Sequence, residues 1–154
     1  MTTSPLAPET ASPPLTTPEH PIALFFDGEC CFCNRWVKRI MDADHAHRTR
    51  FGTKQGATFQ QVASAFPGTR DVNSIVVLLR TREGEERILV RSAAVRTIID
   101  GLPGFKTFNF VLKICPRFLA DVGYRLLARS RKFIFGTQNE CDVVKPEQRA
   151  LFLD

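Results

Sequence analysis

Three cysteines lie close together early in the sequence, at positions 30, 31 and 33. Cys30 and Cys33 are three residues apart, so in the first turn of a helix their side chains share one face and can form and break a disulfide. The unpaired N–H groups at a helix N-terminus favour an anion, which predicts a stabilised thiolate at Cys30. Because thiolates exchange with disulfides through a mixed disulfide, we expect Cys30 to be the nucleophile and Cys33 the thiol that releases the product.

Asp27 precedes this pair, and two roles are open to it. A carboxylate at the end of a strand can act as a general base and accept the proton of Cys33 when that thiol attacks. Alternatively, Asp27 shapes the loop together with Gly28, as an Asx turn or as a cap of the next helix. The sequence leaves both roles open, and one does not exclude the other.

The cysteine cluster also has a metal-site interpretation, since Cys-x-x-Cys is half of a typical zinc-binding pattern. The chain contains no second Cys-x-x-Cys, and His45 and His47 are two residues apart, which points them to different faces of a helix. We therefore expect both histidines at the surface, and no metal or other cofactor.

The remaining cysteines are Cys31, Cys115 and Cys141, which bring the total to five and so exclude complete internal pairing. Cys115 and Cys141 are isolated in the sequence and are expected to be small buried apolar residues. Two alternatives stay open, namely Cys141 as a distal resolving thiol and Cys31 as part of a second disulfide or a buried bystander.

The elements that position the reactive pair are a strand and a helix. Residues 22–26 are all apolar and end at Asp27-Gly28, which predicts a short strand that is buried on both faces and central in a sheet. From Cys31 onward, apolar residues recur at spacings of three and four, which predicts a helix. The cysteine pair therefore falls where a central strand passes into a helix.

The following segments predict, in order, a weak strand, a helix, the two strands of a hairpin and a helix, at residues 50–53, 57–66, 74–80, 87–90 and 92–99. Ser92 is the predicted N-cap of the last of these helices. A helical crossover gives parallel pairing and a tight turn gives antiparallel pairing. This order predicts an α/β protein with a mixed four-stranded sheet and helices on both faces, a thioredoxin-like arrangement.

A C-terminal helical extension is predicted from about residue 105 to residue 131, with a break near Cys115-Pro116. It mixes apolar residues with basic ones such as Arg125 and Arg129. A basic amphipathic helix can lie on an anionic membrane or on a partner. Packing of its apolar residues on the protein's own sheet is the commoner arrangement and is the one expected here.

Length and composition fit one globular domain. The chain has 154 residues, of which 44% are hydrophobic, and its longest apolar runs are far shorter than the roughly 20 residues of a spanning helix. Residues 1–21 hold six of the ten prolines and no Lys or Arg, which predicts a disordered tail. The single domain then covers residues 22–154.

The charge of the chain is basic but evenly spread. The net charge is +5, and the 21 basic and 14 acidic residues after position 21 give that part +7. Because the basic residues are interspersed rather than clustered, no nucleic-acid partner is expected. The first residues show neither a secretory nor a mitochondrial targeting pattern, so we expect a cytoplasmic protein.

The run from Phe25 to Asn34, with its Asp-Gly-x-Cys-x-x-Cys pattern from Asp27 to Cys33, resembles the DCC family of predicted thiol-disulfide oxidoreductases. The resemblance covers nearly all of residues 22–154, and also involves residues 74–78, 91–94, 116–117, 124 and 135–141. It implies a thioredoxin-like fold and redox use of Cys30 and Cys33, but no particular substrate.

One feature departs from the wider thioredoxin superfamily, which usually has a cis-proline before its third strand where the substrate backbone binds. Asn73-Ser74 stands at that place here, so we expect substrate to dock differently. The chemistry requires a protein or small-molecule disulfide or thiol as substrate and a cellular dithiol as reductant. The alternative is a redox-silent or metal-binding module of the same fold that docks a partner or a membrane surface.

Overall fold

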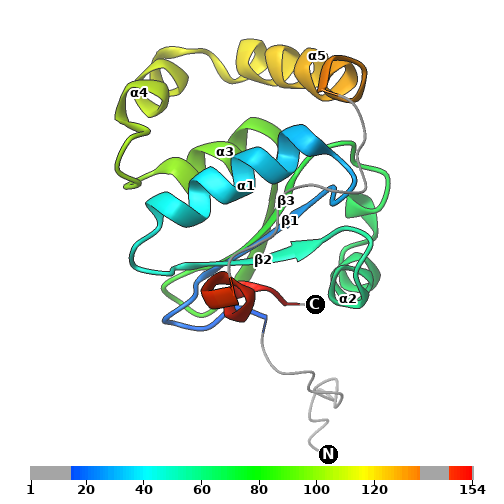
Figure 1. Ribbon diagram of the computed structural model, residues 1–154, viewed down its shortest axis with the longest axis vertical. Helices are drawn as coiled ribbons and strands as arrows, with labels where there is room; N and C mark the ends of the chain where they lie inside the picture. Colours follow the sequence, from blue (N-terminus) through cyan, green and yellow to red (C-terminus); the bar gives the residue numbers. More distant parts are fainter. Residues whose placement is uncertain (1–14, 136–145, 154) are drawn as a thin grey trace, which may run out of the picture.

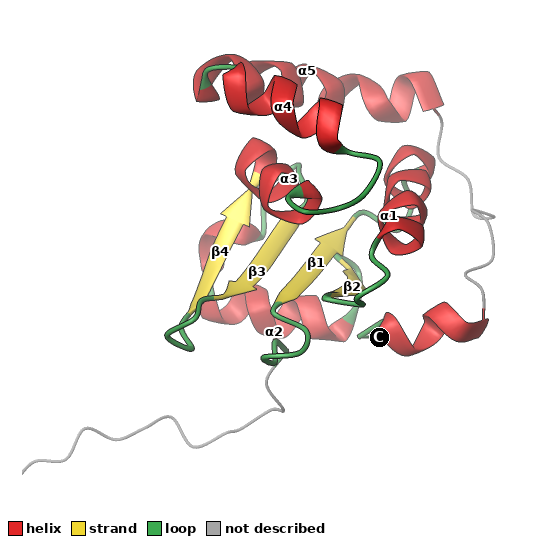
Figure 2. Ribbon diagram, turned by 90° about the vertical axis from the view of Figure 1, so that its left-hand side faces the viewer, coloured by secondary structure: helices red, strands yellow, loops and turns green. Residues whose placement is uncertain are grey.

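The computed structural model describes residues 15–135 and 146–153. Four strands form one mixed sheet in the order β2-β1-β3-β4, as Figure 2 shows. The strands are β1 (Ile22–Phe26), β2 (Thr49–Thr53), β3 (Val76–Arg80) and β4 (Glu86–Val90). Strand β1 pairs parallel with β2 and antiparallel with β3, and β3 pairs antiparallel with β4. The predicted mixed, thioredoxin-like sheet is confirmed, with β1 buried along its whole length at its centre.

Helices cover both faces of this sheet (Figure 1). One face packs against α1 (Cys31–Ala43) and α3 (Arg91–Ile99), and the other against α2 (Ala57–Ala65), which is followed by the short helix η1 (Pro67–Thr69). Because successive side chains of a strand point to opposite faces, β1 contributes to both cores. Leu24 and Phe26 pack under α1, while Ala23 and Phe25 pack under α2.

The C-terminal extension forms two helices, α4 (Lys106–Ile114) and α5 (Arg117–Phe135), separated by the predicted break at Cys115-Pro116. The sequence predicted that they pack on the sheet. Instead, they form a further layer over α1 and α3 (Figure 1). The physical reason is that α1 and α3 already occupy this face of the sheet. The extension can therefore contact only the outer sides of these two helices.

Helix α3 begins differently from the prediction. Val90 is its N-cap, no side chain caps it, and Arg91 is its first residue. The predicted cap, Ser92, lies inside the first turn and its hydroxyl donates a hydrogen bond to the carboxylate of Asp121 on α5. Ser92 therefore joins two helices instead of ending one.

Both ends of the described chain add to the sheet region. Leu15 packs against the core under α2, and the buried Thr16 donates a hydrogen bond to Glu86 on β4. Packing therefore extends upstream of Ile22 into the segment expected to be tail, while residues 1–14 lie outside the described residues. The last segment, η2 (Pro146–Leu151), leads to Phe152, which forms a parallel bridge with Phe51 of β2.

None of the helices within the described ranges is long and apolar enough to cross a lipid bilayer.

Candidate active site

The cysteine cluster lies where the sequence predicted, between the carboxyl end of β1 and the first turn of α1. Cys30 is the N-cap residue, with an extended backbone (φ −95°, ψ 110°), and Cys31 is the first helical residue. The N–H of Asn34 donates to the carbonyl of Cys30 at 3.0 Å, which closes the first helical turn. Cys30 and Cys33 therefore stand at the N-cap and at the third helical position, one turn apart.

All three side chains of the cluster are buried. Cys30 has 0% of its surface exposed, Cys33 5% and Cys31 7%. Cys30 and Cys33 belong to the hydrophobic core between the sheet and α1. In this arrangement the surface of the protein does not present the Cys30 sulfur to another molecule, so any exchange at Cys30 requires the surrounding structure to move.

Asp27 organises this turn. Its Oδ1 accepts hydrogen bonds from the backbone N–H of Glu29 at 3.2 Å and from the side-chain amide of Gln55 at 3.0 Å. Its carbonyl accepts the N–H of Cys30 at 3.2 Å. The bond to Glu29 is an Asx turn, one of the two roles that the sequence left open.

Gln55 is a residue of the site that the sequence analysis missed. Besides its contact to Asp27, its Oε1 accepts the N–H of Gly28 at 3.2 Å. The side chain of Asn34 closes the turn from the other side by donating to the Gly28 carbonyl at 2.9 Å. A signal existed in the sequence: the parallel pairing of β1 and β2 brings their carboxyl ends together, and Gln55 follows β2 directly.

Gly28 is required by a close approach. A Cβ atom at this position would lie 3.1 Å from Cγ2 of Thr53, the last residue of β2, and 3.4 Å from Oε1 of Gln55. A side chain at position 28 therefore pushes the turn away from the end of β2.

Aromatic rings connect the helix of the cluster to the outer helical layer. The ring of Trp36 lies 6.1 Å from that of Phe32, 5.8 Å from that of Phe105 and 6.0 Å from that of Phe108, measured between centroids. Phe105 and Phe108 belong to the start of α4. Trp36 thus ties α1 to α4 one turn beyond Cys33.

The segment before β3 is hydrogen-bonded to another part of the same chain. The backbone N–H of Ile75 donates a hydrogen bond to the hydroxyl of Tyr124 on α5 at 3.1 Å. This N–H follows Asn73-Ser74, the segment at which the thioredoxin superfamily has its cis-proline. The helical extension therefore occupies the N–H group of Ile75, which would otherwise be available to a ligand.

A cavity of about 380 Å³ lies between the inner helices α1 and α3 and the outer helices α4 and α5. Its walls are almost entirely apolar, and both Cys33 and Cys115 line it. Cys115, at the end of α4, is half-buried, whereas Cys141 lies outside the described residues. That Cys33 and Cys115 border one cavity was not predictable from the sequence, because only the packing of the outer layer brings them there.

Within the described ranges, no group of three His, Cys, Asp or Glu side chains is arranged to hold a metal ion. His45 and His47 are exposed, at the end of α1 that is remote from the cysteines.

Comparisons with known proteins show the family of the chain. The model of the DCC1-like thiol-disulfide oxidoreductase family matches residues 24–137, and the chain belongs to this family. It is 32% identical over 127 residues to a chloroplastic DCC family protein of Arabidopsis thaliana, which covers 81% of this chain and 70% of the plant protein. It is 28% identical over 132 residues to the uncharacterized protein YuxK of Bacillus subtilis, with 84% of this chain and 92% of YuxK covered. No solved structure matches the chain at a significant level.

Proposed function

We propose that the protein is a thiol-disulfide oxidoreductase that reacts through Cys30 and Cys33. The observation that carries the proposal is the placement of these two residues one turn apart at the N-terminus of α1, beyond the end of the central strand. The N-cap is the position whose side chain faces the unpaired N–H groups of the first turn. Cys30 stands at the N-cap without a side-chain hydrogen bond to the first turn, and family membership supports thiol chemistry for this pair.

The proposed reaction has two exchange steps. The Cys30 thiolate attacks one sulfur of a substrate disulfide, forms a mixed disulfide and displaces the other substrate sulfur as a thiolate. The Cys33 thiolate then attacks the Cys30 sulfur, which forms the Cys30–Cys33 disulfide and releases the second substrate thiol. A cellular dithiol returns the pair to its reduced form, becoming a disulfide itself.

Asp27 is proposed as the base that accepts the Cys33 proton before the second step. Its hydrogen bonds to Glu29 and Gln55 hold its carboxylate beside the start of α1. The substrate is proposed to be a protein or small-molecule disulfide, and the cytoplasm is proposed as the compartment, because its dithiol systems keep such thiols reduced.

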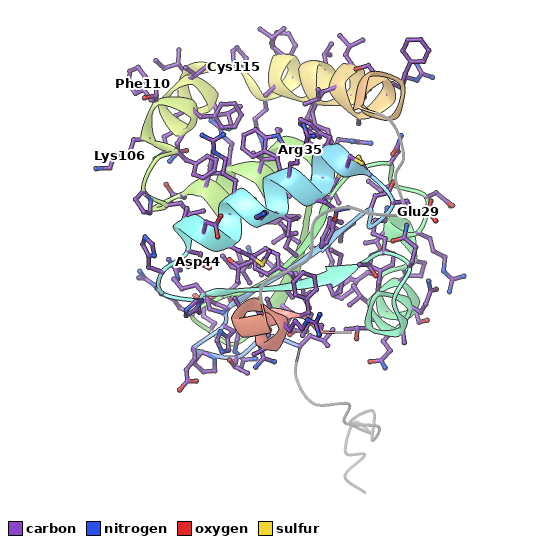
Figure 3. All side chains as sticks on the ribbon, in the orientation of Figure 1. Glu29, Arg35, Asp44, Lys106, Phe110 and Cys115 are labelled. Carbon is purple, nitrogen blue, oxygen red and sulfur yellow. The ribbon has the colours of Figure 1, made fainter. Side chains whose placement is uncertain are left out.

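Burial of Cys30 adds a requirement to this mechanism. The turn over residues 27–30 has to open before substrate reaches the sulfur, and Glu29, the exposed residue of that turn, is the point of first contact. Figure 3 shows Glu29 at the tip of α1, directed away from the body of the protein. Opening breaks the hydrogen bonds of Gln55 and Asn34 to Gly28 rather than any strand pairing of the sheet.

The test is trapping of the mixed disulfide. The full chain and its Cys30→Ser, Cys33→Ser and Cys115→Ser variants are incubated with oxidised glutathione, alkylated and mapped by mass spectrometry. We expect a Cys30–Cys33 disulfide in the parent, a stable glutathione adduct at Cys30 in Cys33→Ser, and loss of disulfide reduction in Cys30→Ser. Cys115→Ser is the matched control and is expected to behave as the parent.

A second candidate, a redox-silent module of the same fold, is favoured by the complete burial of Cys30. The same experiment separates the two functions. Modification of Cys115 alone, with Cys30 and Cys33 remaining as thiols at every ratio of oxidised to reduced glutathione, would establish the redox-silent module and refute the oxidoreductase.

A further inference from the structure

The outer surface of α4 and α5 is covered by large apolar side chains. Eight of the described apolar residues of α4 and α5 are each at least 45% exposed, and what we call the α4–α5 face consists of six of these, namely Phe110, Val111, Ile114, Phe118, Val122 and Leu126. The most exposed of them are Phe118 at 72% and Ile114 at 67%. Figure 3 shows Phe110 on the outer side of α4, away from α1. Large exposed apolar side chains gathered on one part of a surface are typical of interaction sites.

The spacing of these residues shows that the face is distinct from the surface that holds the extension in place. At 100° per residue, Phe118, Val122 and Leu126 form one stripe of α5 at intervals of four. Tyr124, which bonds to Ile75, and Ala128, which is buried, lie on the opposite side of the same helix. Helix α5 therefore docks on the protein with one side and exposes a second apolar side.

The charges of α4 and α5 are almost all positive, although Lys113 pairs with Asp100, the residue that follows α3, at 3.4 Å. The described side chains of α4 and α5 include five exposed basic residues, Lys106, Lys113, Arg117, Arg125 and Arg129. The one acidic residue of the two helices, Asp121, is half-buried and accepts a hydrogen bond from Ser92 on the inner side. The side of α5 that carries this face thus combines apolar residues with positive charge.

We propose that the α4–α5 face docks the protein peripherally on an anionic lipid bilayer. The apolar rings and aliphatic side chains enter the interface between headgroups and acyl chains, while the basic side chains contact the lipid phosphates. A second copy of the chain is a poorer occupant, since pairing two such faces brings five basic residues on each side together with one acidic residue. The proposal concerns a surface apart from Cys30 and Cys33, so it stands or falls independently of the redox reaction.

The test is partitioning of the full chain onto phospholipid vesicles, measured by co-sedimentation. Vesicles of phosphatidylcholine with phosphatidylglycerol are compared with vesicles of phosphatidylcholine alone, at low and high salt. We expect binding to the anionic vesicles that weakens as salt screens the phosphate contacts. Absence of binding to the anionic vesicles, or equal binding to both kinds, would overturn the proposal.

Two pairs of substitutions separate the apolar and the electrostatic contributions. Phe110→Ser with Phe118→Ser is expected to lower the partition coefficient on the order of tenfold for each ring removed. Arg125→Gln with Arg129→Gln is expected to lower it on the order of tenfold in total. The matched control is Arg70→Gln with Arg82→Gln, which removes the same charge from exposed positions outside α4 and α5.

Two results of these variants would contradict a lipid-docking face. One is an equal loss of binding in the Arg70 and Arg82 control, which would make the attraction a property of the net charge. The other is a dimer in sedimentation velocity without lipid that dissociates in the Phe110→Ser and Phe118→Ser variant, which would assign the face to contacts between copies.

Discussion

Helices α1 and α5 have similar compositions, both mixing apolar and basic residues, but they differ in how many of their apolar sides are covered. Helix α1 buries Val37, Ile40 and Met41 against the sheet, and its outer side is covered by α4, which contacts Trp36. Helix α5 is apolar on the side that contacts α1 and α3 and again on the side that carries Phe118 and Leu126. Both apolar sides of α1 are covered within the described part of the chain, whereas the outer apolar side of α5 is exposed.

This difference distinguishes two layers of the molecule. Folding buries the apolar residues of the inner layer, whereas part of the apolar surface of the outer layer, α4 and α5, stays exposed. Apolar residues of the sheet and of α1 contribute to the free energy of unfolding because folding removes them from water. The outward apolar residues of α5 stay in water after folding, so they contribute little to stability. They gain free energy only when something else covers them.

The largest expected effect is the difference in stability between removing a buried phenylalanine ring of the inner layer and removing an exposed one of the outer layer. Phe25 is fully buried and its ring lies 5.4 Å from that of Phe59, whereas Phe110 is 64% exposed. We expect Phe25→Ala to lower the free energy of unfolding by about 3 to 5 kcal/mol. We expect Phe110→Ala to change it by less than about 0.5 kcal/mol. Urea unfolding followed by circular dichroism measures both.

A loss of several kcal/mol in the Phe110→Ala variant would contradict the separation into two layers. It would mean that the outer side of α4 packs against another part of the chain. Equal slopes of the two unfolding curves are needed for the comparison, because a changed slope indicates a change in the denatured state or in two-state behaviour.

The next effect concerns the turn that covers Cys30. In Gly28→Ala, the added methyl group meets Cγ2 of Thr53, a β-branched residue whose rotamer is restricted. We expect a loss of about 1 to 2 kcal/mol in the free energy of unfolding and faster alkylation of Cys30, because the turn moves away from β2. Gly68→Ala is the matched control, since a Cβ there meets no atom within 4 Å. Unchanged alkylation of Cys30 in a destabilised Gly28→Ala variant would show that this turn does not control access.

The sheet and the position of the cysteines were predictable because both depend on local patterns. The apolar run from Ile22 to Phe26 is buried on both faces only in a central strand. The order of strands and helices along the chain determines which strands pair in parallel. The start of α1 at Cys31 followed from the spacing of apolar residues. These features need no knowledge of what lies far away in the sequence.

The features that escaped prediction depend on contacts between distant residues. Gln55 bonds to Asp27 across 28 positions, and Ser92 bonds to Asp121 across 29. A serine before an apolar run is typical of a helix cap, but its hydroxyl bonds instead to a carboxylate that a later helix brings close. In the same way, the periodicity of residues 117–135 predicts a helix but does not say what covers each of its sides.

A smaller effect tests how α5 is held on the inner layer. Tyr124→Phe removes the hydroxyl that accepts the Ile75 N–H. We expect a loss of about 1 kcal/mol and faster hydrogen exchange of the Ile75 amide. Ser130→Ala is the matched control, because the Ser130 hydroxyl bonds within α5 to the carbonyl of Leu126. If exchange at Ile75 is the same in Tyr124→Phe and in the parent protein, α5 is held by its apolar contacts alone.

The smallest effect is a pH dependence of the same attachment. The Ser92 hydroxyl that bonds to Asp121 holds the pKa of this carboxyl below its usual value of 3.8, against the opposing effect of partial burial. A lowered pKa in the folded state stabilises the protein above the unfolded-state pKa, and this stabilisation is lost as the pH falls through the folded-state pKa. Asp121→Asn keeps an acceptor oxygen but no charge. We therefore expect the parent to be more stable than Asp121→Asn at pH 5 to 7, by less than about 1 kcal/mol, and this difference to shrink below pH 4 in urea unfolding. Asp71→Asn, at an exposed position, serves as the charge control. If the difference between the parent and Asp121→Asn instead grows toward acidic pH, the Ser92 bond does not favour the charged carboxylate.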